Sequence, residues 1–145
     1  LSGGSKNIFA ENCDMNSPAL QRAIRIKTNN NRGGVSDGIY IRDLKVGQVS
    51  EAVVKINCSY DPREGQGEFM PVVKNVYVSN ITTQKSRYGL SLIGIKGENC
   101  VENIYINNCK FNGVTQGNQV QYVKNLNLND LLVNGEKVDQ INLEN

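Results

Sequence analysis

The sequence predicts an all-β protein, a right-handed parallel β-helix in which short strands stack coil upon coil, a coil being one full turn of the solenoid. Three observations predict it: an eight-residue phrase that occurs five times, an Asn or Asp at the same place in each copy, and the lack of a helical period. The copies are KNIFAENC from Lys6, DGIYIRDL from Asp37, KNVYVSNI from Lys74, ENIYINNC from Glu102 and KNLNLNDL from Lys124. Such repetition, with loops of variable length, is typical of a solenoid.

Each copy places apolar residues two apart, which is the spacing of side chains on one face of a strand. The first apolar positions are 31, 37, 28 and 22 residues apart. We expect them to form one inward column along the solenoid axis: Ile8, Ile39, Val76, Ile104 and Leu126. A second inward column is expected after the Asn or Asp of each copy: Cys13, Leu44, Ile81, Cys109 and Leu131.

A one-residue corner separates the two columns: Asn12, Asp43, Asn80, Asn108 and Asp130. Asn and Asp tolerate a left-handed backbone and hydrogen-bond their own backbone, so a single residue can turn the chain between two short strands. Further along, three coils carry a third strand-like segment, at residues 23–27, 53–57 and 89–93. A leucine-rich horseshoe would need helical segments between its strands, and the sequence has none.

Composition limits the classes of function. The length suits one domain, 1–145, with no transmembrane run, and a net charge of +2 is too small to favour a nucleic-acid partner. Because the chain has no histidine, Ser-His and Cys-His catalysis and His-ligated metal sites are excluded within it, and we predict no metal site. The chain does not begin with Met, so we expect Leu1 to be a cut end.

The four cysteines show no CxxC spacing. Cys13 and Cys109 stand where other copies have Leu or Ile, and we interpret them as small core residues rather than as a disulfide or redox pair. Cys58 and Cys100 have no assigned role.

The third segment of the first coil carries unexpected charge. Ile24 and Ile26 are expected to face the core, so that Arg25 and Lys27 face solvent on the same side. The next coil would then place Lys55 beside Arg25. Like charges at strand separation repel, which favours an anion between them. The alternative is an ordinary solvated face with scattered lysines.

Several segments resemble the C-terminal half of a bacterial polygalacturonase-type enzyme, glycoside hydrolase family twenty-eight: SGGSKNIFAENC, NSPALQRAIRIKTN, RGG, IYIRDLKVGQVSEAVVKIN and FNGV. The most specific element is the tripeptide Arg25-Ile26-Lys27. In that family the Arg and Lys line the cleft and bind galacturonate near the scissile bond. The resemblance also implies that Tyr60 contacts the substrate, and Lys55 completes our set of candidate substrate-binding residues.

The catalytic residues of that family lie in an Asn-Thr-Asp motif, an Asp-Asp pair and a Gly-His-Gly motif, all upstream of the matching segments, and none occurs in this chain. We therefore name no catalytic residue here. The chain's aspartates considered for that role occupy corners or loops: Asp14, Asp37, Asp43, Asp61, Asp130 and Asp139. The resemblance implies a partial β-helix, the C-terminal part of a larger pectin-hydrolase domain, with the remainder of the β-helix N-terminal to Leu1.

The activity implied for that larger protein is hydrolysis of α-1,4-linked galacturonate with inversion, by two carboxyl groups roughly 6.5–9.5 Å apart. Arg25 and Lys27 would hold the substrate carboxylate by charge-assisted hydrogen bonds. The implied partner is polygalacturonate or a pectin oligosaccharide, with no cofactor and no membrane, and the implied location is secreted or periplasmic. Exo or endo cleavage, and galacturonan or rhamnogalacturonan as substrate, stay open.

Two alternatives remain. A pectate lyase also uses a parallel β-helix and an arginine, but it needs clustered carboxylates for calcium. A non-catalytic β-helix could bind an acidic glycan or serve as a rigid spacer.

Overall fold

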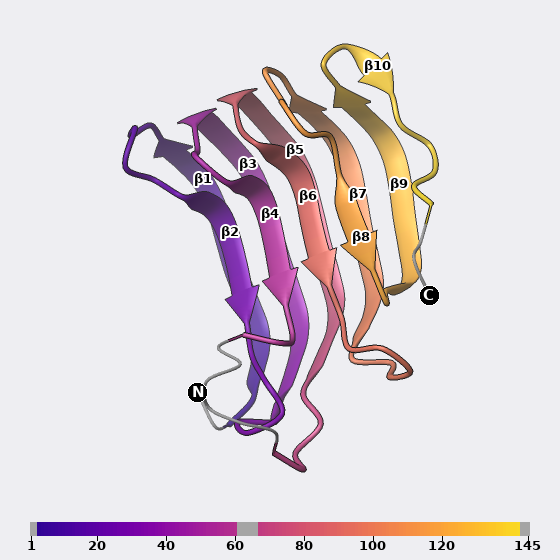
Figure 1. Ribbon diagram of the computed structural model, residues 1–145. Coiled ribbons are helices and arrows are strands. Elements are labelled where there is room, and N and C mark those ends of the chain that lie inside the picture. The colour runs from indigo at the N-terminus through magenta and orange to yellow at the C-terminus, as the bar shows by residue number, and fades with distance from the viewer. Residues whose placement is uncertain (1–2, 61–66, 143–145) are drawn as a thin grey trace.

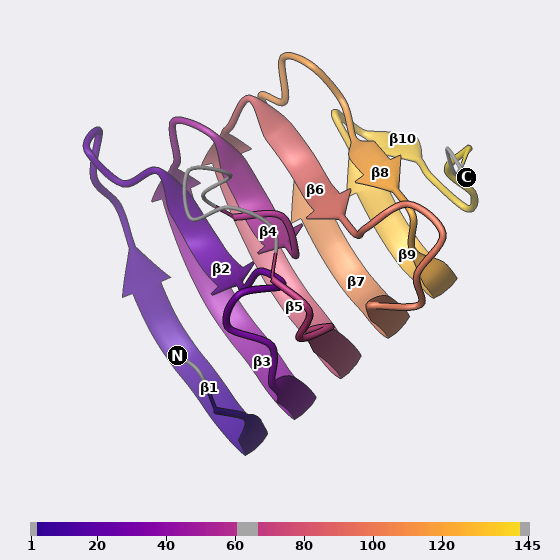
Figure 2. The same ribbon diagram turned by 60° about the horizontal axis from the view of Figure 1, so that its bottom comes forward.

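The protein folds as a parallel β-helix, which confirms the predicted fold class. The computed structural model describes residues 3–60 and 67–142, and these residues form strands and no helix. One sheet has six strands, in the order β1 (Ser5–Met15), β3 (Val35–Gln48), β5 (Val72–Lys85), β7 (Val101–Phe111), β9 (Lys124–Val133) and β10 (Glu136–Lys137). The other has four, in the order β2 (Arg22–Lys27), β4 (Ala52–Asn57), β6 (Tyr88–Ile93) and β8 (Gln119–Gln121). The four-stranded sheet lies in front of the six-stranded sheet in Figure 1, and Figure 2 shows the coils following one another along one axis.

The register of the six-stranded sheet is the one that the repeats predict. Ile8, Ile39, Val76, Ile104 and Leu126 pair in succession across β1, β3, β5, β7 and β9. In the second column Cys13 pairs with Leu44, Leu44 with Ile81, and Cys109 with Leu131. Apolar side chains of the two sheets meet between them in one continuous core.

The first coil is in register but is not buried. Ile8 is 47% exposed, whereas Ile104 in the same column is 0% exposed. The prediction that Ile8 is buried in the core is therefore wrong. Its side chain stays exposed because β1 has a neighbouring strand on one side only. Phe9 beside it is also exposed. At the opposite end β10 turns back antiparallel on β9 and covers part of that edge.

The corner residues adopt the predicted left-handed conformation. Their φ angles are 55° at Asn12, 59° at Asp43, 55° at Asn80, 48° at Asn108 and 52° at Asp130. A second left-handed column, which the sequence analysis did not assign, precedes the first apolar position of each copy: Asn7, Gly38, Asn75, Asn103 and Asn125. Each long strand of the first sheet from β1 to β9 therefore bends at two places rather than one.

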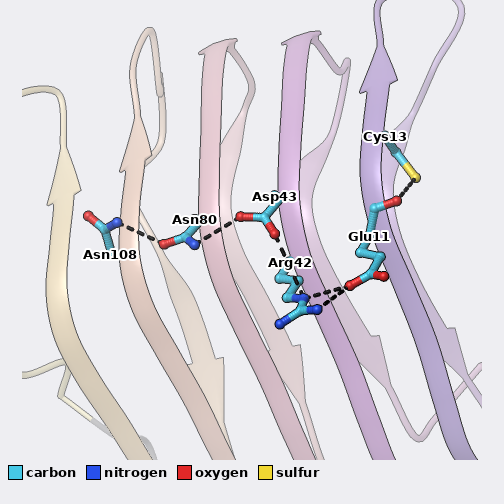
Figure 3. A network of polar contacts seen from close by, with 6 residues as sticks. All are labelled: Glu11, Cys13, Arg42, Asp43, Asn80 and Asn108. Carbon is cyan, nitrogen blue, oxygen red and sulfur yellow. Dashed lines mark hydrogen bonds and ion pairs between the residues drawn. The ribbon is translucent and has the colours of Figure 1, made fainter.

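Three residues of the predicted corner column also form a ladder of side-chain hydrogen bonds, drawn in Figure 3. Asn80 donates to the carboxylate of Asp43 at 2.9 Å, and Asn108 donates to the carbonyl of Asn80 at 2.8 Å. Beside this ladder Arg42 donates to Glu11 of the preceding strand at 2.6 Å. The strands β1, β3, β5 and β7 are thus joined in succession through polar side chains as well as through the backbone.

Four of the nine aromatic residues, which look scattered in the sequence, form a stack on the outer face of the same sheet. The ring centroids of Phe9 and Tyr40 are 4.8 Å apart, those of Tyr40 and Tyr77 5.0 Å, and those of Tyr77 and Tyr105 4.7 Å. These residues hold equivalent positions in successive copies, between the two residues of the first apolar pair. Their stacking therefore follows from the register of the strands.

The predicted third segments are confirmed as β2, β4 and β6. A fourth such strand, β8, was not predicted, because its three residues contain a single apolar side chain, Val120. The described residues contain no helix, and therefore no helix among them is long and apolar enough to cross a membrane.

All four cysteines are free. Cys109 is buried as a core residue, as predicted, whereas Cys13 on the first coil is partly buried. Cys58 and Cys100 are buried together, with the Cys58 sulfur 3.8 Å from the carbonyl oxygen of Cys100. Contact with Cys100 and burial both raise the pKa of the Cys58 thiol.

Candidate functional site

Strands β2 and β4 place the predicted cations side by side on the outer surface. Arg25 pairs with Lys55, and Lys27 pairs with Asn57. Ile24, on the opposite face of β2, is buried in the core. The side-chain alternation of the strand therefore directs Arg25 and Lys27 to solvent, as the sequence analysis expects.

The backbone beyond β4 brings Tyr60 to these cations. The amide of Tyr60 donates to the carbonyl of Thr28 at 3.1 Å, and the side chain of Asn29 donates to the carbonyl of Tyr60 at 2.8 Å. Asn29 is buried, so this anchor lies within the fold rather than on its surface. Tyr60 is thereby fixed beside the end of β2, although it follows β4 in the chain.

The ring of Tyr60 contacts both cations. Its centroid lies 5.1 Å from the guanidinium carbon of Arg25 and 4.1 Å from the ammonium nitrogen of Lys27. Both distances are within the range at which a cation is attracted to an aromatic face. The structure therefore brings together three of the four residues that the sequence analysis names, with Lys55 on the neighbouring strand.

We expect this contact to be visible in the titration of Tyr60. Hydrogen bonding and charge attraction from Lys27, followed by hydrogen bonding from Arg25, lower the pKa of its phenol. Replacing Lys27 by Met should raise that pKa toward the ordinary value for tyrosine, which is about 10. The pKa is measured from the ring signals in nuclear magnetic resonance spectra, assigned by comparison with Tyr60→Phe. Lys45→Met, on the other sheet, should leave it unchanged, and a Tyr60 pKa that does not respond to Lys27→Met would contradict the contact.

A shallow pocket lies among these side chains. Its volume is about 140 Å³, and its lining is Arg22, Arg25, Ile26, Lys27, Lys55, Asn57 and Tyr60. Pockets that enclose a whole ligand measure roughly 300–1,000 Å³, so this pocket suits a single anionic group better than an entire sugar ring. We call it the cationic pocket.

One carboxylate modifies the charge of the cationic pocket, and the sequence analysis missed it. Glu51 forms ion pairs with Lys55 and with Arg22. Burial acts to raise the pKa of Glu51, but hydrogen bonding and charge attraction from Lys55 and Arg22 outweigh it, so that the pKa lies below its usual range. The crowding of Arg25 and Lys55, from which an anion was inferred, is therefore already relieved in part by the protein itself.

Arg25 and Lys27 differ in their ion pairing from Arg22 and Lys55, which both pair with Glu51. Among residues 3–60 and 67–142, no carboxylate forms an ion pair with either of them. Both side chains are exposed. Within the cationic pocket these two groups can therefore accept an anion from solution without first losing an ion-pair partner among the described residues.

The aspartates of the described residues lie away from the cationic pocket lining. Asp37 accepts a hydrogen bond from Asn75, Asp43 belongs to the corner ladder, and Asp139 pairs with Lys137. Asp61 lies outside the described residues. In the part of the chain that the structure describes, no three acidic, Cys or His side chains gather as metal ligands would.

Larger hollows occur on other parts of the described surface. One of about 490 Å³ is lined by Gly97, Glu98, Asn99 and residues 122–125. Its lining contains one acidic and one basic side chain, Glu98 and Lys124, so charge of a single sign is not concentrated there. We therefore place the candidate site at the smaller cationic pocket, where the charge is concentrated.

Comparison with known proteins supports the fold. No protein-family model matches the chain, and no curated protein matches it. Among solved structures, the chain is similar to a hyperthermoactive exopolygalacturonase from Thermotoga maritima, with a TM-score of 0.85 and 29% sequence identity. The fold resembles that of a polygalacturonase. The match covers 94% of this chain but 29% of that one, so this chain spans less than a third of the length of the enzyme that it matches.

Proposed function

We propose that this chain forms the acidic-sugar-binding part of a pectin-degrading glycoside hydrolase of family twenty-eight. The observation that carries the proposal is the convergence of Arg25, Lys27 and Tyr60, with no carboxylate paired to either cation among the described residues. The similar fold belongs to an exopolygalacturonase, whose substrate class is a polymer of uronic acid. A galacturonate carboxylate fits a small pocket with two available cations.

Each of these side chains has a distinct part in holding the sugar. Arg25 presents a planar fork that can bind both oxygens of one carboxylate, whereas Lys27 acts as a point charge. Tyr60 keeps the two cations close to its ring and offers a hydroxyl beside them. Lys55 acts from the next strand through its charge, which Glu51 reduces.

The chemical step is proposed to lie outside this chain. Inverting hydrolysis of an α-1,4-galacturonosyl bond needs one carboxylic acid to protonate the leaving oxygen and one carboxylate to activate water. We propose that residues N-terminal to Leu1 supply both groups and continue the β-helix, so that 1–145 is the C-terminal segment of one larger domain. Because pectin lies in cell walls, we propose a secreted or periplasmic location.

The isolated chain should bind oligogalacturonate without cleaving it. Binding follows from the two cations, and the lack of cleavage follows because the catalytic motifs of family twenty-eight do not occur in this sequence. Titration of trigalacturonate at low ionic strength should perturb the resonances of Arg25, Lys27 and Tyr60, and a neutral galactose trisaccharide is the control. Reducing ends that appear at an enzymatic rate would show that the catalytic groups lie within the chain, and equal binding of the neutral sugar would contradict the proposal.

Assays on a longer protein that includes the proposed upstream residues separate the alternatives. A calcium-dependent, unsaturated product released by the chain together with its upstream residues would identify a lyase, but the cationic pocket presents cations where that chemistry needs carboxylates. A non-catalytic glycan-binding module is supported by the same cations. It predicts that binding occurs but that the chain extended by its upstream residues still cleaves nothing.

A further inference from the structure

Glu51 joins two of the four cations of the cationic pocket, Arg22 and Lys55, and the other two have no ion-pair partner among the described residues. One carboxylate oxygen pairs with Arg22 on β2, and the other pairs with Lys55 on β4. All three side chains are mostly covered, with exposed fractions of 15% for Arg22, 24% for Glu51 and 19% for Lys55. An ion pair that is largely covered is screened by salt much less than an exposed one.

The backbone holds Glu51 in this place. Its amide donates to the carbonyl of Gln21 at 2.9 Å, and its carbonyl accepts from Arg87 at 3.0 Å and from Tyr88 at 2.8 Å. The residue is therefore tied to the segment before β2 on one side and to the start of β6 on the other. Because its backbone is fixed on both sides, Glu51 keeps a negative charge at the Lys55 side of the cationic pocket.

A fixed negative charge at this position limits which anions the cationic pocket accepts. A group with a single charge can bind at Arg25 and Lys27 alone. A compact dianion would also draw on Lys55, but it would then meet the carboxylate of Glu51, and like charges brought together in a partly covered site repel strongly. Glu51 also occupies donors of Arg22 and Lys55 that a larger anion would need.

We infer that Glu51 is a specificity-determining residue, which restricts the cationic pocket to singly charged sugar carboxylates and rejects sulfate-like and phosphate-like dianions. This inference rests on the proposed function, since it assumes that a uronate is the ligand. It goes beyond that function because Glu51 is not one of the proposed sugar-binding residues. Glu51 would determine how much negative charge a bound ligand can carry. Glu51 acts through Lys55 and Arg22 and need not touch the sugar.

The test compares two probes, trigalacturonate and inorganic sulfate, by titration calorimetry on the 145-residue chain. Replacing Glu51 by Gln should tighten sulfate binding about tenfold, because two further cations become available. Trigalacturonate binding should change far less, so the ratio of the two dissociation constants should shift toward sulfate. A general loss of structure would weaken both ligands and would not produce this shift.

The matched control is Glu11→Gln, which removes one negative charge from another Glu–Arg pair, that of Glu11 and Arg42 on the six-stranded sheet. It should leave the ratio unchanged. Glu51→Asp keeps the negative charge, so this variant should continue to reject sulfate. It also provides a second variant for the test if Glu51→Gln does not fold. An equal gain of sulfate binding in Glu51→Gln and Glu11→Gln, or loss of sulfate rejection in Glu51→Asp, would overturn the inference.

The result also separates this inference from the proposed function. If trigalacturonate binds but Glu51→Gln gains no sulfate affinity, the inference about Glu51 fails and the proposed function stands. If trigalacturonate does not bind while Glu51→Gln gains sulfate affinity, the uronate assignment fails and Glu51 keeps its role in excluding dianions.

Discussion

Replacing Ile104 by alanine should lower the free energy of unfolding by about 2–5 kcal/mol. Ile104 is 0% exposed and lies within the apolar column, between Val76 and Leu126. Its truncation removes buried methyl groups and leaves a cavity that strands fixed on both sides cannot close. Urea unfolding followed by circular dichroism measures the change.

The same column contains its own control. Ile8 is the equivalent residue of the first coil, but it is 47% exposed. Ile8→Ala should therefore cost at most about 1 kcal/mol, as is usual for a side chain that is not enclosed. Equal losses for Ile8→Ala and Ile104→Ala would contradict the description of β1 as an open edge.

The repeated phrase was sufficient to predict the columns and corners of the solenoid. A strand has a side-chain period of two, so the apolar pairs determined which side chains point inward and which copies lie in register. Asn and Asp at a fixed place predicted left-handed corners, and all five residues have positive φ. The outward direction of Arg25 and Lys27 followed from the same alternation.

Features that depend on loops and on neighbouring coils could not be predicted in this way. Glu51 lies in the turn before β4, where no period applies, and its partners come from two different strands. The contact of Tyr60 with Lys27 depends on the anchor at Asn29, which precedes Tyr60 by 31 residues. Burial of the first coil depends on what lies beside β1, and the pattern within one copy carries no information about that.

Arg25→Lys should weaken the binding of oligogalacturonate about tenfold, although the positive charge is kept. The guanidinium can donate two parallel hydrogen bonds to one carboxylate, and an ammonium group cannot reproduce that geometry. A loss of one such charged hydrogen bond, worth roughly 1.5–3 kcal/mol, corresponds to a factor of about ten or more. The contact with the ring of Tyr60 would also be altered.

The two lysines should respond differently to salt. Lys27→Met removes an available cation next to Tyr60, so binding should weaken at both low and high salt. Lys55→Met removes a cation that Glu51 already neutralises in part, so its effect should act through the longer-range field and fade as salt rises. Equal salt dependence of the two variants would contradict this assignment of roles.

The most direct test of the substrate-binding role of the cationic pocket is made at Arg25, by the dissociation constant for trigalacturonate of the 145-residue chain and of two matched variants. Arg25→Lys changes the cationic pocket, whereas Arg42→Lys makes the same substitution at an arginine on β3 that pairs with Glu11. Circular dichroism confirms that both variants are folded. We expect Arg25→Lys to raise the dissociation constant about tenfold and Arg42→Lys to leave it unchanged. If both folded variants bind trigalacturonate as tightly as the unmodified chain, Arg25 is an ordinary solvated residue and the cationic pocket does not recognise a uronate.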